Sequence, residues 1–450
     1  MIDIVALLQC TRPYVTATTV RQLNRIIVAM VAMTGRVTML GLARWAGKGG
    51  SYRTVQRFFA TVIPWGMLFW VFFRQHVYCP DDVYLVAGDE VIVTKAGKHT
   101  HGLDRFFSSL YGKPVPGLSF FTLSLVSVQK RRSFPMRVEQ GVRSEAEKAV
   151  SKAKAAAKKP KSPSAKRRPG RPKGSTNKTK TTVMLTPELL RIKAMLEALL
   201  QLIAKVLSVT YLVLDGHFGH HHALQMARQC NVHLISKLRC DAALYFPYTG
   251  PYAGRGPHRK YGRKVDYDHL PLQYLTATTV EGDIETSLYH AQLLHKEFAH
   301  PLNVVIIAKT NLRTQACAHV ILFSSDLALA ATLLVDYYSL RFQIEFNFRE
   351  AKQYWGLEDF MNITPTGVTN AANLSLFMVN VAYRLRADLQ PRDPDYSVLD
   401  LKADWRGYTY VEETLKMLPE KPESVLLAKI RNHVAGLGRI HASQPSFSFS

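Results

Sequence analysis

The sequence lacks a cysteine framework. Its five cysteines are scattered and form no Cys-x-x-Cys pair: Cys10, Cys79, Cys230, Cys240 and Cys317. An odd number of cysteines without regular spacing excludes a disulfide-stapled scaffold and predicts reduced thiols, as in a cytosol.

Long hydrophobic runs are also missing. The longest strongly apolar run, from Met67 to Phe73, is too short to cross a bilayer. The first ten residues carry no basic leader before their apolar positions, so we expect no signal peptide. These absences exclude a membrane-spanning protein and predict a cytoplasmic one.

Acidic residues are scarce. The chain has 34 Asp and Glu against 58 Lys and Arg, which gives a net charge of +24. Such an excess predicts a polyanionic partner, with nucleic acid as the first candidate and an anionic membrane as the second. With 450 residues, 47% of them hydrophobic, the chain is long enough to bury a large core in two or three domains.

One stretch, from Asp336 to Glu358, has the composition and period of an amphipathic helix of about six turns. On such a helix an arc of about 60° would hold Tyr338, Arg341, Glu345 and Lys352. Buried charges are costly unless paired, so this edge is poor core material. The residues alone leave two interpretations open: a solvated face with an ion pair between Arg341 and Glu345, or a site in which Glu345 binds a metal and the other three hold phosphates.

The spacing of these four residues resembles a known signature. Tyr, two residues, Arg, three residues, Glu, six residues and Lys is similar to the YREK signature of bacterial DDE transposases of insertion sequence family 4 and related families. The flanking sequence RFQIEFNFREAKQYWGLE also resembles that family. The resemblance extends over roughly residues 80–390 and, more loosely, over the N-terminal region.

The resemblance implies three catalytic acids, Asp89, Asp215 and Glu345, in an α/β fold with a ribonuclease H-like catalytic core. In that fold the three carboxylates meet although they lie far apart in the sequence. Taken alone, Asp89 also reads as a strand-end residue with Glu90 as a competing ligand, and Asp215 reads as a turn residue.

The strand pattern agrees with this order. Three strand-like stretches with short joins, 82–94, 118–129 and 134–140, predict an antiparallel meander. A strand, a helix and a strand between residues 211 and 239 predict a parallel pair.

The resemblance also implies the chemistry. Transfer of a phosphodiester needs charge neutralisation at the entering and the leaving oxygen, which two Mg²⁺ ions supply and for which Mn²⁺ can substitute. Mg²⁺ prefers oxygen ligands, so the three acids are the expected metal ligands. Tyr338, Arg341 and Lys352 are then expected to hold DNA phosphates.

Residues 1–80 read as helical and resemble a helix-turn-helix. A helix around 38–45, the turn GKGG and a Ser-capped basic helix over 51–60 would present Arg53, Gln56 and Arg57 to a major groove. An ordinary helical bundle with a basic surface is the alternative.

A basic linker follows the meander. Residues 143–180 hold fourteen Lys and Arg against two Glu, about half of the chain's net charge, and have no apolar face. Within it Arg168, Gly170, Arg171 and Pro172 belong to a segment that resembles an AT-hook for the minor groove of A·T-rich DNA. A non-specific polycation that binds phosphates is the alternative.

The histidines and aromatics between the strands carry weaker signals. The run GHFGHHH, residues 216–222, permits a zinc site, although we favour a loop that touches DNA. Residues 241–318 read as a β-rich insertion without tryptophan, where family relatives use an aromatic to promote a DNA hairpin. Tyr245, Tyr248, Tyr252 or Tyr261 are the possible substitutes.

We therefore expect five regions. They are a helical DNA-binding domain at 1–80, a catalytic core at 81–142, 183–240 and 319–390, the linker at 143–182, the insertion at 241–318 and a C-terminal region at 391–450.

The function we expect is that of a DDE transposase. It binds terminal inverted repeats and catalyses Mg²⁺-dependent cleavage and strand transfer on double-stranded DNA, as a homodimer in the bacterial cytoplasm at the nucleoid. The alternatives are a transposase-derived DNA-binding regulator, and a nuclease or resolvase that does not join strands.

Overall fold

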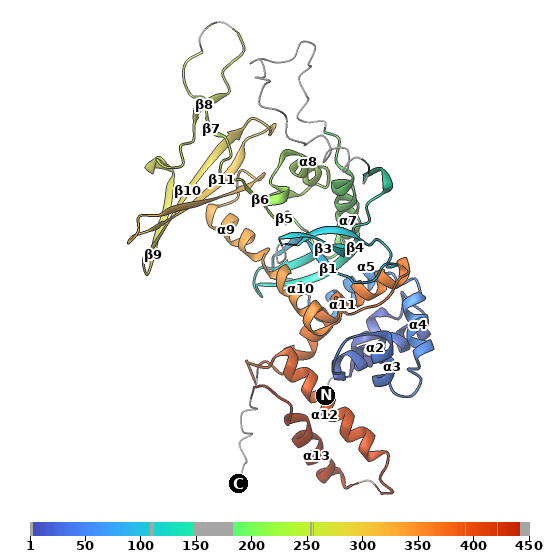
Figure 1. The fold of residues 1–450 in the computed structure, drawn as a ribbon. Helices are drawn as coiled ribbons and strands as arrows, with labels where there is room; N and C mark the ends of the chain where they lie inside the picture. Colours follow the sequence, from blue (N-terminus) through green and yellow to red (C-terminus); the bar gives the residue numbers. More distant parts are fainter. Residues whose placement is uncertain are drawn as a thin grey trace. The chain divides into compact units, whose positions relative to one another are not determined.

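A computed structural model describes residues 3–108, 112–147, 149, 183–252, 254, 256–391, 393–420 and 422–441. The chain has mixed α/β structure, as predicted, and divides into two compact units (Figure 1). The first unit holds Met1–Gln140, Ala198–Ser208 and Phe342–Ser450. The second unit holds Gly141–Glu197 and Val209–Arg341.

Five helices open the first unit. They are α1 (Ile4–Leu8), α2 (Ala17–Ala32), α3 (Met39–Trp45), α4 (Tyr52–Ala60) and α5 (Trp65–His76), with a 3₁₀ turn at Gln9–Thr11. Thr16, Thr38 and Ser51 begin α2, α3 and α4, and each side chain accepts the backbone N–H three residues later. The helix, turn and helix expected within residues 38–60 are therefore present.

The sheet of the first unit is built on its longest strand. The strands are β1 (Tyr84–Thr94), β2 (Asp104–Ser108), β3 (Lys113–Ser127) and β4 (Arg132–Gln140). β3 pairs antiparallel with β1 along one edge, and with β2 and then β4 along the other. The predicted antiparallel meander is confirmed, with β2 as an extra strand.

Four later helices complete this unit: α10 (Gln343–Tyr354), α11 (Pro365–Ala387), α12 (Val398–Leu415) and α13 (Ser424–Gly436). α11 covers the open edge of β4, where the amides of Asn373 and Asn380 donate to the carbonyls of Val138 and Pro135. These side-chain donors satisfy carbonyls of the β4 backbone, so this edge is closed to further strands.

The described residues of the second unit form eight strands: β5 (Tyr211–Leu214), β6 (His233–Leu238), β7 (Leu244–Pro247), β8 (Tyr261–Lys264), β9 (Leu275–Glu281), β10 (Ile284–His295), β11 (Leu302–Asn311) and β12 (Cys317–Ser324). Their order is β5, β6, β12, β11, β10, β7, β8, with β9 on β10. β5 and β6 are parallel, as predicted, and the others pair antiparallel.

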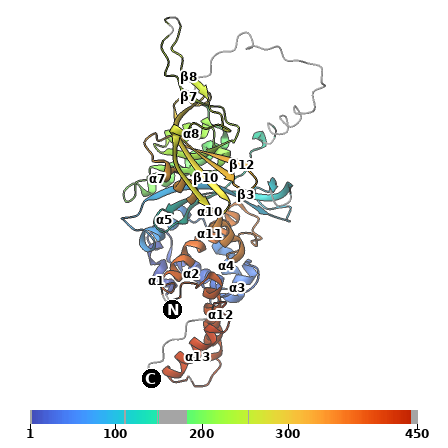
Figure 2. The ribbon, with the colours of Figure 1, turned by 90° about the vertical axis from the view of Figure 1, so that its left-hand side faces the viewer.

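The helices of this unit are α8 (His221–Gln229) and α9 (Ala331–Leu340), and the first part of α7 (Pro187–Ile203) also belongs to it. Two 3₁₀ turns, Gly216–Phe218 and Leu272–Tyr274, interrupt its loops. β7 pairs with the last residues of β10, and β8 follows it at the end of this unit's strand order (Figure 2).

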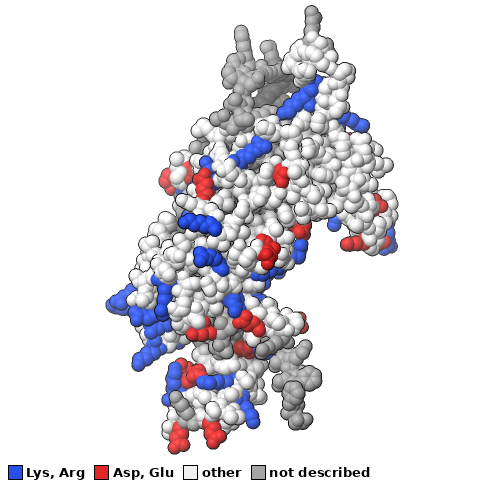
Figure 3. Space-filling view, turned by 180° about the vertical axis from the view of Figure 1, so that it is seen from behind, with Lys and Arg blue, Asp and Glu red and all other residues white. Residues whose placement is uncertain are grey.

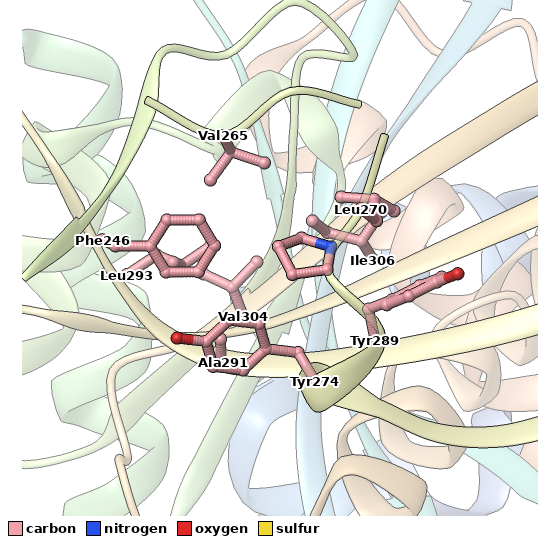
Figure 4. Close-up of a pocket in the computed structure, with 10 residues that line it drawn as sticks. Phe246, Val265, Leu270, Tyr274, Tyr289, Ala291, Leu293, Val304 and Ile306 are labelled. Atoms are coloured by element: carbon pink, nitrogen blue, oxygen red, sulfur yellow. The ribbon is translucent and has the colours of Figure 1, made fainter. Parts of the chain in front are cut away.

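A small apolar core lies beside β10 and β11 (Figure 4). The rings of Phe246 and Tyr274 stack with centroids 4.9 Å apart, and Val265 and Leu270 close the cluster over Val304. Apart from the hydroxyls of Tyr274 and Tyr289, the side chains here are apolar, so the cluster stabilises the insertion by packing.

Within the described ranges, no single helix is both long and apolar enough to cross a membrane. Taken together, α4 and α5 pass that test, with a bend of 100° between them.

Candidate active site

Asp89 lies in the middle of β1, on one face of the first unit's sheet. Its partner across the antiparallel ladder is Thr122 of β3, and the next pair on that face is Ala87 and Ser124. Asp89 is half-buried, and its Oδ1 accepts the backbone N–H of Glu90 at 2.8 Å. A carboxylate in a strand centre is unusual, because Asp is depleted in strands, so a function for it is the simpler explanation.

The neighbours of Asp89 are buried hydroxyls. Thr122 and Ser124 are fully buried, and within the described part of the chain neither hydroxyl has a hydrogen-bond partner. Unsatisfied buried polar groups cost free energy, and in native proteins they mark functional sites or bound ions and waters. These oxygen atoms extend a polar surface beside the carboxylate.

Glu90 points to the other face of the sheet. Successive side chains alternate along a strand, and the hydroxyl of Ser119 donates to the Glu90 carboxylate there. Ser119 is the ladder partner of Ile92, which shares the face of Glu90. Asp89 and Glu90 therefore cannot serve the same site.

Helix α10 packs against β4 and β1. The amide of Asn347 donates to the hydroxyl of Ser133 at 2.9 Å, and the register of β4, β3 and β1 places Ser133 on the face of Asp89. At the far end of the helix, Lys352 Nζ donates to the carbonyl of Ile92 on β1 at 3.0 Å. The helix thus lies across the face that carries Asp89.

Glu345 stands two turns before Lys352 on the same edge of α10. Because Lys352 reaches β1, this edge faces the strand of Asp89. Glu345 is half-buried and lies in the first turn of its helix, where the dipole favours a negative charge. The first unit therefore holds two of the three predicted acids on elements that pack together.

Lys352 is already engaged by protein groups. Besides the carbonyl of Ile92, its ammonium contacts the Glu358 carboxylate at 2.8 Å. A phosphate that binds Lys352 would compete with this ion pair.

The predicted continuous helix from Asp336 to Glu358 is wrong. α9 ends at Leu340 and α10 begins at Gln343. At the break the backbone hydrogen bonds shorten to three residues: Arg341 N to Tyr338 O, and Glu345 N to Phe342 O. Tyr338 precedes the break, Arg341 lies within it, and Glu345 and Lys352 follow it, so the arc expected for a regular helix does not apply.

Tyr338 and Arg341 belong to the second unit. The guanidinium of Arg341 lies 6.0 Å from the centre of the Tyr338 ring, at the outer limit of a cation–π contact. Their role as phosphate ligands remains a prediction.

Asp215 follows β5 directly and begins the 3₁₀ turn Gly216–Phe218. Its Oδ1 accepts the backbone N–H of His217 at 3.1 Å, and its carbonyl accepts the hydroxyl of Ser236 on β6 at 2.7 Å. Asp215 is half-buried at the end of a buried strand. It thus has the turn geometry that the sequence allowed.

The three acids are divided between the units, with Asp89 and Glu345 in the first and Asp215 in the second. Within the described residues, no group of three or more His, Cys, Asp and Glu side chains is placed to hold a metal ion. Convergence of the three acids remains a prediction. The donors themselves are carboxylate and hydroxyl oxygens, which suit Mg²⁺ better than a transition metal.

The histidine run has structural partners. His220 begins α8, and its Nδ1 accepts the backbone N–H of Ala223 at 3.3 Å. His217 lies 3.8 Å from Glu188, and its hydrogen bond lowers the pKa of that carboxyl. Burial lowers the pKa of His220, which favours the neutral ring that an N-cap acceptor needs.

One basic residue beside the site escaped the sequence analysis. Lys95 follows β1, and its Nζ donates to the carbonyls of Glu358 at 3.0 Å and Phe360 at 2.8 Å. Burial lowers the pKa of Lys95 to about 8. Its neighbours lie more than 260 residues away in sequence, so no local pattern could reveal them.

The N-terminal helices present the expected basic residues. Arg53 and Arg57 are exposed on α4, while Val55, Phe58 and Phe59 are buried. Gly49 has a φ of +82°, and a Cβ there would meet the guanidinium of Arg25 at 2.6 Å, so the turn before α4 requires glycine. Figure 3 shows Lys and Arg side chains gathered along one edge of these helices.

The AT-hook-like residues Arg168, Gly170, Arg171 and Pro172 lie outside the described residues.

Comparison with known proteins gives one match. A family model described as DDE superfamily endonuclease matches residues 10–293. The match includes Asp89 and Asp215 and ends before Glu345. A search of curated proteins found no match.

Proposed function

Because the chain belongs to the family of DDE superfamily endonucleases, an enzyme family that acts on nucleic acid, we propose that it is a DNA transposase. It binds the terminal inverted repeats of its element, cleaves the DNA at their ends and joins them to a target. The finer parts of this proposal, from repeat binding to strand transfer, go beyond the family.

One observation carries the proposal. Two of the three acids that the family resemblance implies, Asp89 and Glu345, lie on a strand and a helix that pack together through Lys352 and Ile92. The neighbouring hydroxyls of Thr122 and Ser124 have no hydrogen-bond partner among the described residues. A purely structural role would not leave a strand-centre carboxylate beside two unsatisfied oxygens.

The chain's own residues perform the following tasks. Asp89, Asp215 and Glu345 hold divalent cations, which when bound neutralise the charge of the reacting phosphodiester and lower the pKa of water. Arg341 and Tyr338 orient a neighbouring phosphate, and Lys352 does so after release from Glu358. The backbone N–H of Glu90 holds one oxygen of the Asp89 carboxylate in place.

DNA binding is assigned to separate parts of the chain. α4 enters a major groove with Arg53 and Arg57, and the basic segment around Arg168, Gly170, Arg171 and Pro172 follows a minor groove. Paired transposon ends require two active sites, so the active complex is a homodimer on DNA.

The test uses a matched set of variants. Asp89→Asn, Asp215→Asn and Glu345→Gln should each lower Mg²⁺-dependent nicking of the transposon ends by about a thousandfold or more and leave binding of the ends unchanged, because only the metal ligands change. Glu90→Gln removes the same charge one residue from Asp89, on the opposite face, and should keep nicking within a few-fold of wild type. Normal cutting by all three acid variants would refute the proposal.

A second assay separates the alternatives. Pre-cut ends with a free 3′-hydroxyl are incubated with a supercoiled target and Mg²⁺. Joined products identify a transposase, cleavage without joining identifies a nuclease or resolvase, and neither activity with intact binding identifies a DNA-binding regulator.

A further inference from the structure

A polar pocket lies in the first unit, formed by α10, α11 and the start of β4. Its volume is about 380 Å³, and its wall includes Arg132, Gln343, Phe346, Arg349, Glu350 and Arg386. None of these residues belongs to the four-residue signature or the acid triad. The pocket opens on the side of α10 that lies away from Glu345 and Lys352.

Positive charge exceeds negative charge in this pocket. Arg132 and Arg386 share the carboxylate of Glu350, at 3.5 and 3.6 Å. The other oxygen of Glu350 accepts the indole N–H of Trp355 at 3.1 Å. Arg349 adds a third cation, so the pocket wall contains three guanidinium groups and one carboxylate.

Two guanidinium donors have no hydrogen-bond acceptor. Within the described part of the chain, Arg132 Nε and Arg386 Nη2 are buried without such a partner. Arg386 is only 8% exposed, and its burial lowers the pKa of the guanidinium despite the nearby Glu350. Each guanidinium keeps its ion pair with Glu350, and Arg386 Nε also donates to the carbonyl of Ala382 at 3.3 Å. An anion with several oxygens would accept hydrogen bonds from the two donors that lack one.

An exposed aromatic ring stands at the rim of the pocket. Phe346 is 43% exposed, and the guanidinium of Arg349 lies 5.2 Å from its ring centre. Burying the exposed face of this phenylalanine ring would be favourable, and a nucleic-acid base is a flat ring of suitable size to stack on it.

We propose that this pocket binds one nucleotide of a single DNA strand, with its phosphate on Arg132 and Arg386 and its base on Phe346. The inference rests on the proposed function, because it supplies a place for the strand that leaves the cleavage site. Glu345 and Phe346 are consecutive on α10 and lie about 100° apart around the helix, so a strand that reaches both must cross the surface of the helix.

The test uses the full-length chain carrying Asp89→Asn, so that no DNA is cut. Binding of thymidine 5′-monophosphate and of inorganic phosphate is measured by isothermal titration calorimetry. Arg132→Gln should weaken both ligands about tenfold or more. Phe346→Ala should weaken the nucleotide roughly tenfold or more, since one stacking contact contributes about 1–3 kcal/mol, and should leave phosphate binding unchanged.

Arg131→Gln is the matched control, since it removes the same charge at an adjacent residue outside the pocket wall. Equal affinities for Arg132→Gln and Arg131→Gln, or no binding by the parent protein, would overturn the proposal. Should Arg132→Gln fail to fold by circular dichroism, Arg132→Lys keeps the charge but loses the two-pronged donor and should still weaken both ligands several-fold.

Nicking of transposon ends is then measured with Asp89 restored. Nucleotide binding without nicking would refute the transposase and keep the pocket. Nicking without nucleotide binding would support the transposase and refute the nucleotide pocket.

Discussion

At the residue scale, a shift of one position decides which acid can be catalytic. The sequence favours Asp89 as the catalytic acid with Glu90 as a competing ligand, and strand alternation puts the two side chains on opposite faces. Glu90 accepts the hydroxyl of Ser119, whereas Asp89 shares its face with the helix that carries Glu345. The sequence and its family resemblance predicted the strand and the choice of Asp89, and the register adds that Glu90 lies on the opposite face of the sheet.

A buried lysine gives a prediction at the same scale. Lys402 of α12 is 8% exposed, donates to the carbonyl of Met30 at the end of α2, and lies 4.9 Å from the centre of the Trp355 ring. Burial lowers its pKa from 10.5 to about 8. Between these two pH values the unfolded chain binds the proton of Lys402 more tightly than the folded chain does, so the contribution of Lys402 to the free energy of unfolding rises with pH. Below about pH 8 Lys402 is protonated in both states, and the full cost of burying its charge opposes folding.

The measurement compares wild type with Lys402→Met by urea unfolding at several pH values across that window. The difference in free energy of unfolding should move in favour of wild type as the pH rises. Lys429→Met, the same change at an exposed position of α13, is the control. A difference that stays constant across the window would contradict the burial argument.

At the scale of elements, local sequence patterns predicted the strands that pair with strands close to them in the sequence. Alternating side chains sufficed for the antiparallel β1, β3 and β4, and short spacing sufficed for the parallel β5 and β6. The break between α9 and α10 could not be predicted, because Arg341 and Phe342 are ordinary helix residues and keep right-handed helical dihedrals. Only the loss of the regular hydrogen bonds marks it.

The pocket between α10 and α11 was also beyond sequence-based prediction. Glu350 meets Arg132 and Arg386 from parts of the chain that are remote in sequence. In the sequence, Arg349 and Glu350 look like surface charges of a helix, since nothing local shows that one of them is buried.

The end of α10 supports a second prediction. Gly356 follows the last turn with a φ of +77°, and a Cβ there would lie 2.4 Å from the Cβ of Val37. Gly356→Ala should therefore lower the free energy of unfolding by about 1–3 kcal/mol from backbone strain alone, and by more from the clash. Chemical denaturation checks the value.

Gly436→Ala serves as the control, because Gly436 ends α13 with no positive φ, and a Cβ added there would have no atom within 4 Å. If the two alanine variants were equally stable, the prediction would be wrong, because the backbone at residue 356 and the side chain of Val37 would then accommodate the added Cβ without loss of stability.

At the scale of the whole molecule, the net charge of +24 predicts strong and salt-dependent binding to any DNA. Specific recognition must then come from a few residues that read base edges. Arg53 and Arg57 are exposed on a capped helix after a glycine turn, which suits them to this task.

The third prediction follows from this difference between charge-driven binding to any DNA and recognition of base edges. Replacing both Arg53 and Arg57 by Gln should reduce the preference for the terminal repeat over unrelated DNA by about 1–3 kcal/mol for each base that the arginines read. Fluorescence anisotropy at two salt concentrations measures both affinities. Arg21→Gln, at an exposed position of α2, should weaken both DNAs equally. If the double variant kept the same preference for the terminal repeat, another surface of the protein would have to recognise the sequence.

The order in which the chain builds its two units restricts how it can be dissected. The backbone changes unit after residues 140, 197, 208 and 341, and α10 comes only after the last of these. A stop codon at residue 293, where the family match ends, would remove Glu345 together with the four helices that complete the first unit. No single proteolytic cut releases either unit whole, so a minimal catalytic fragment must be made by excising internal segments and rejoining the ends.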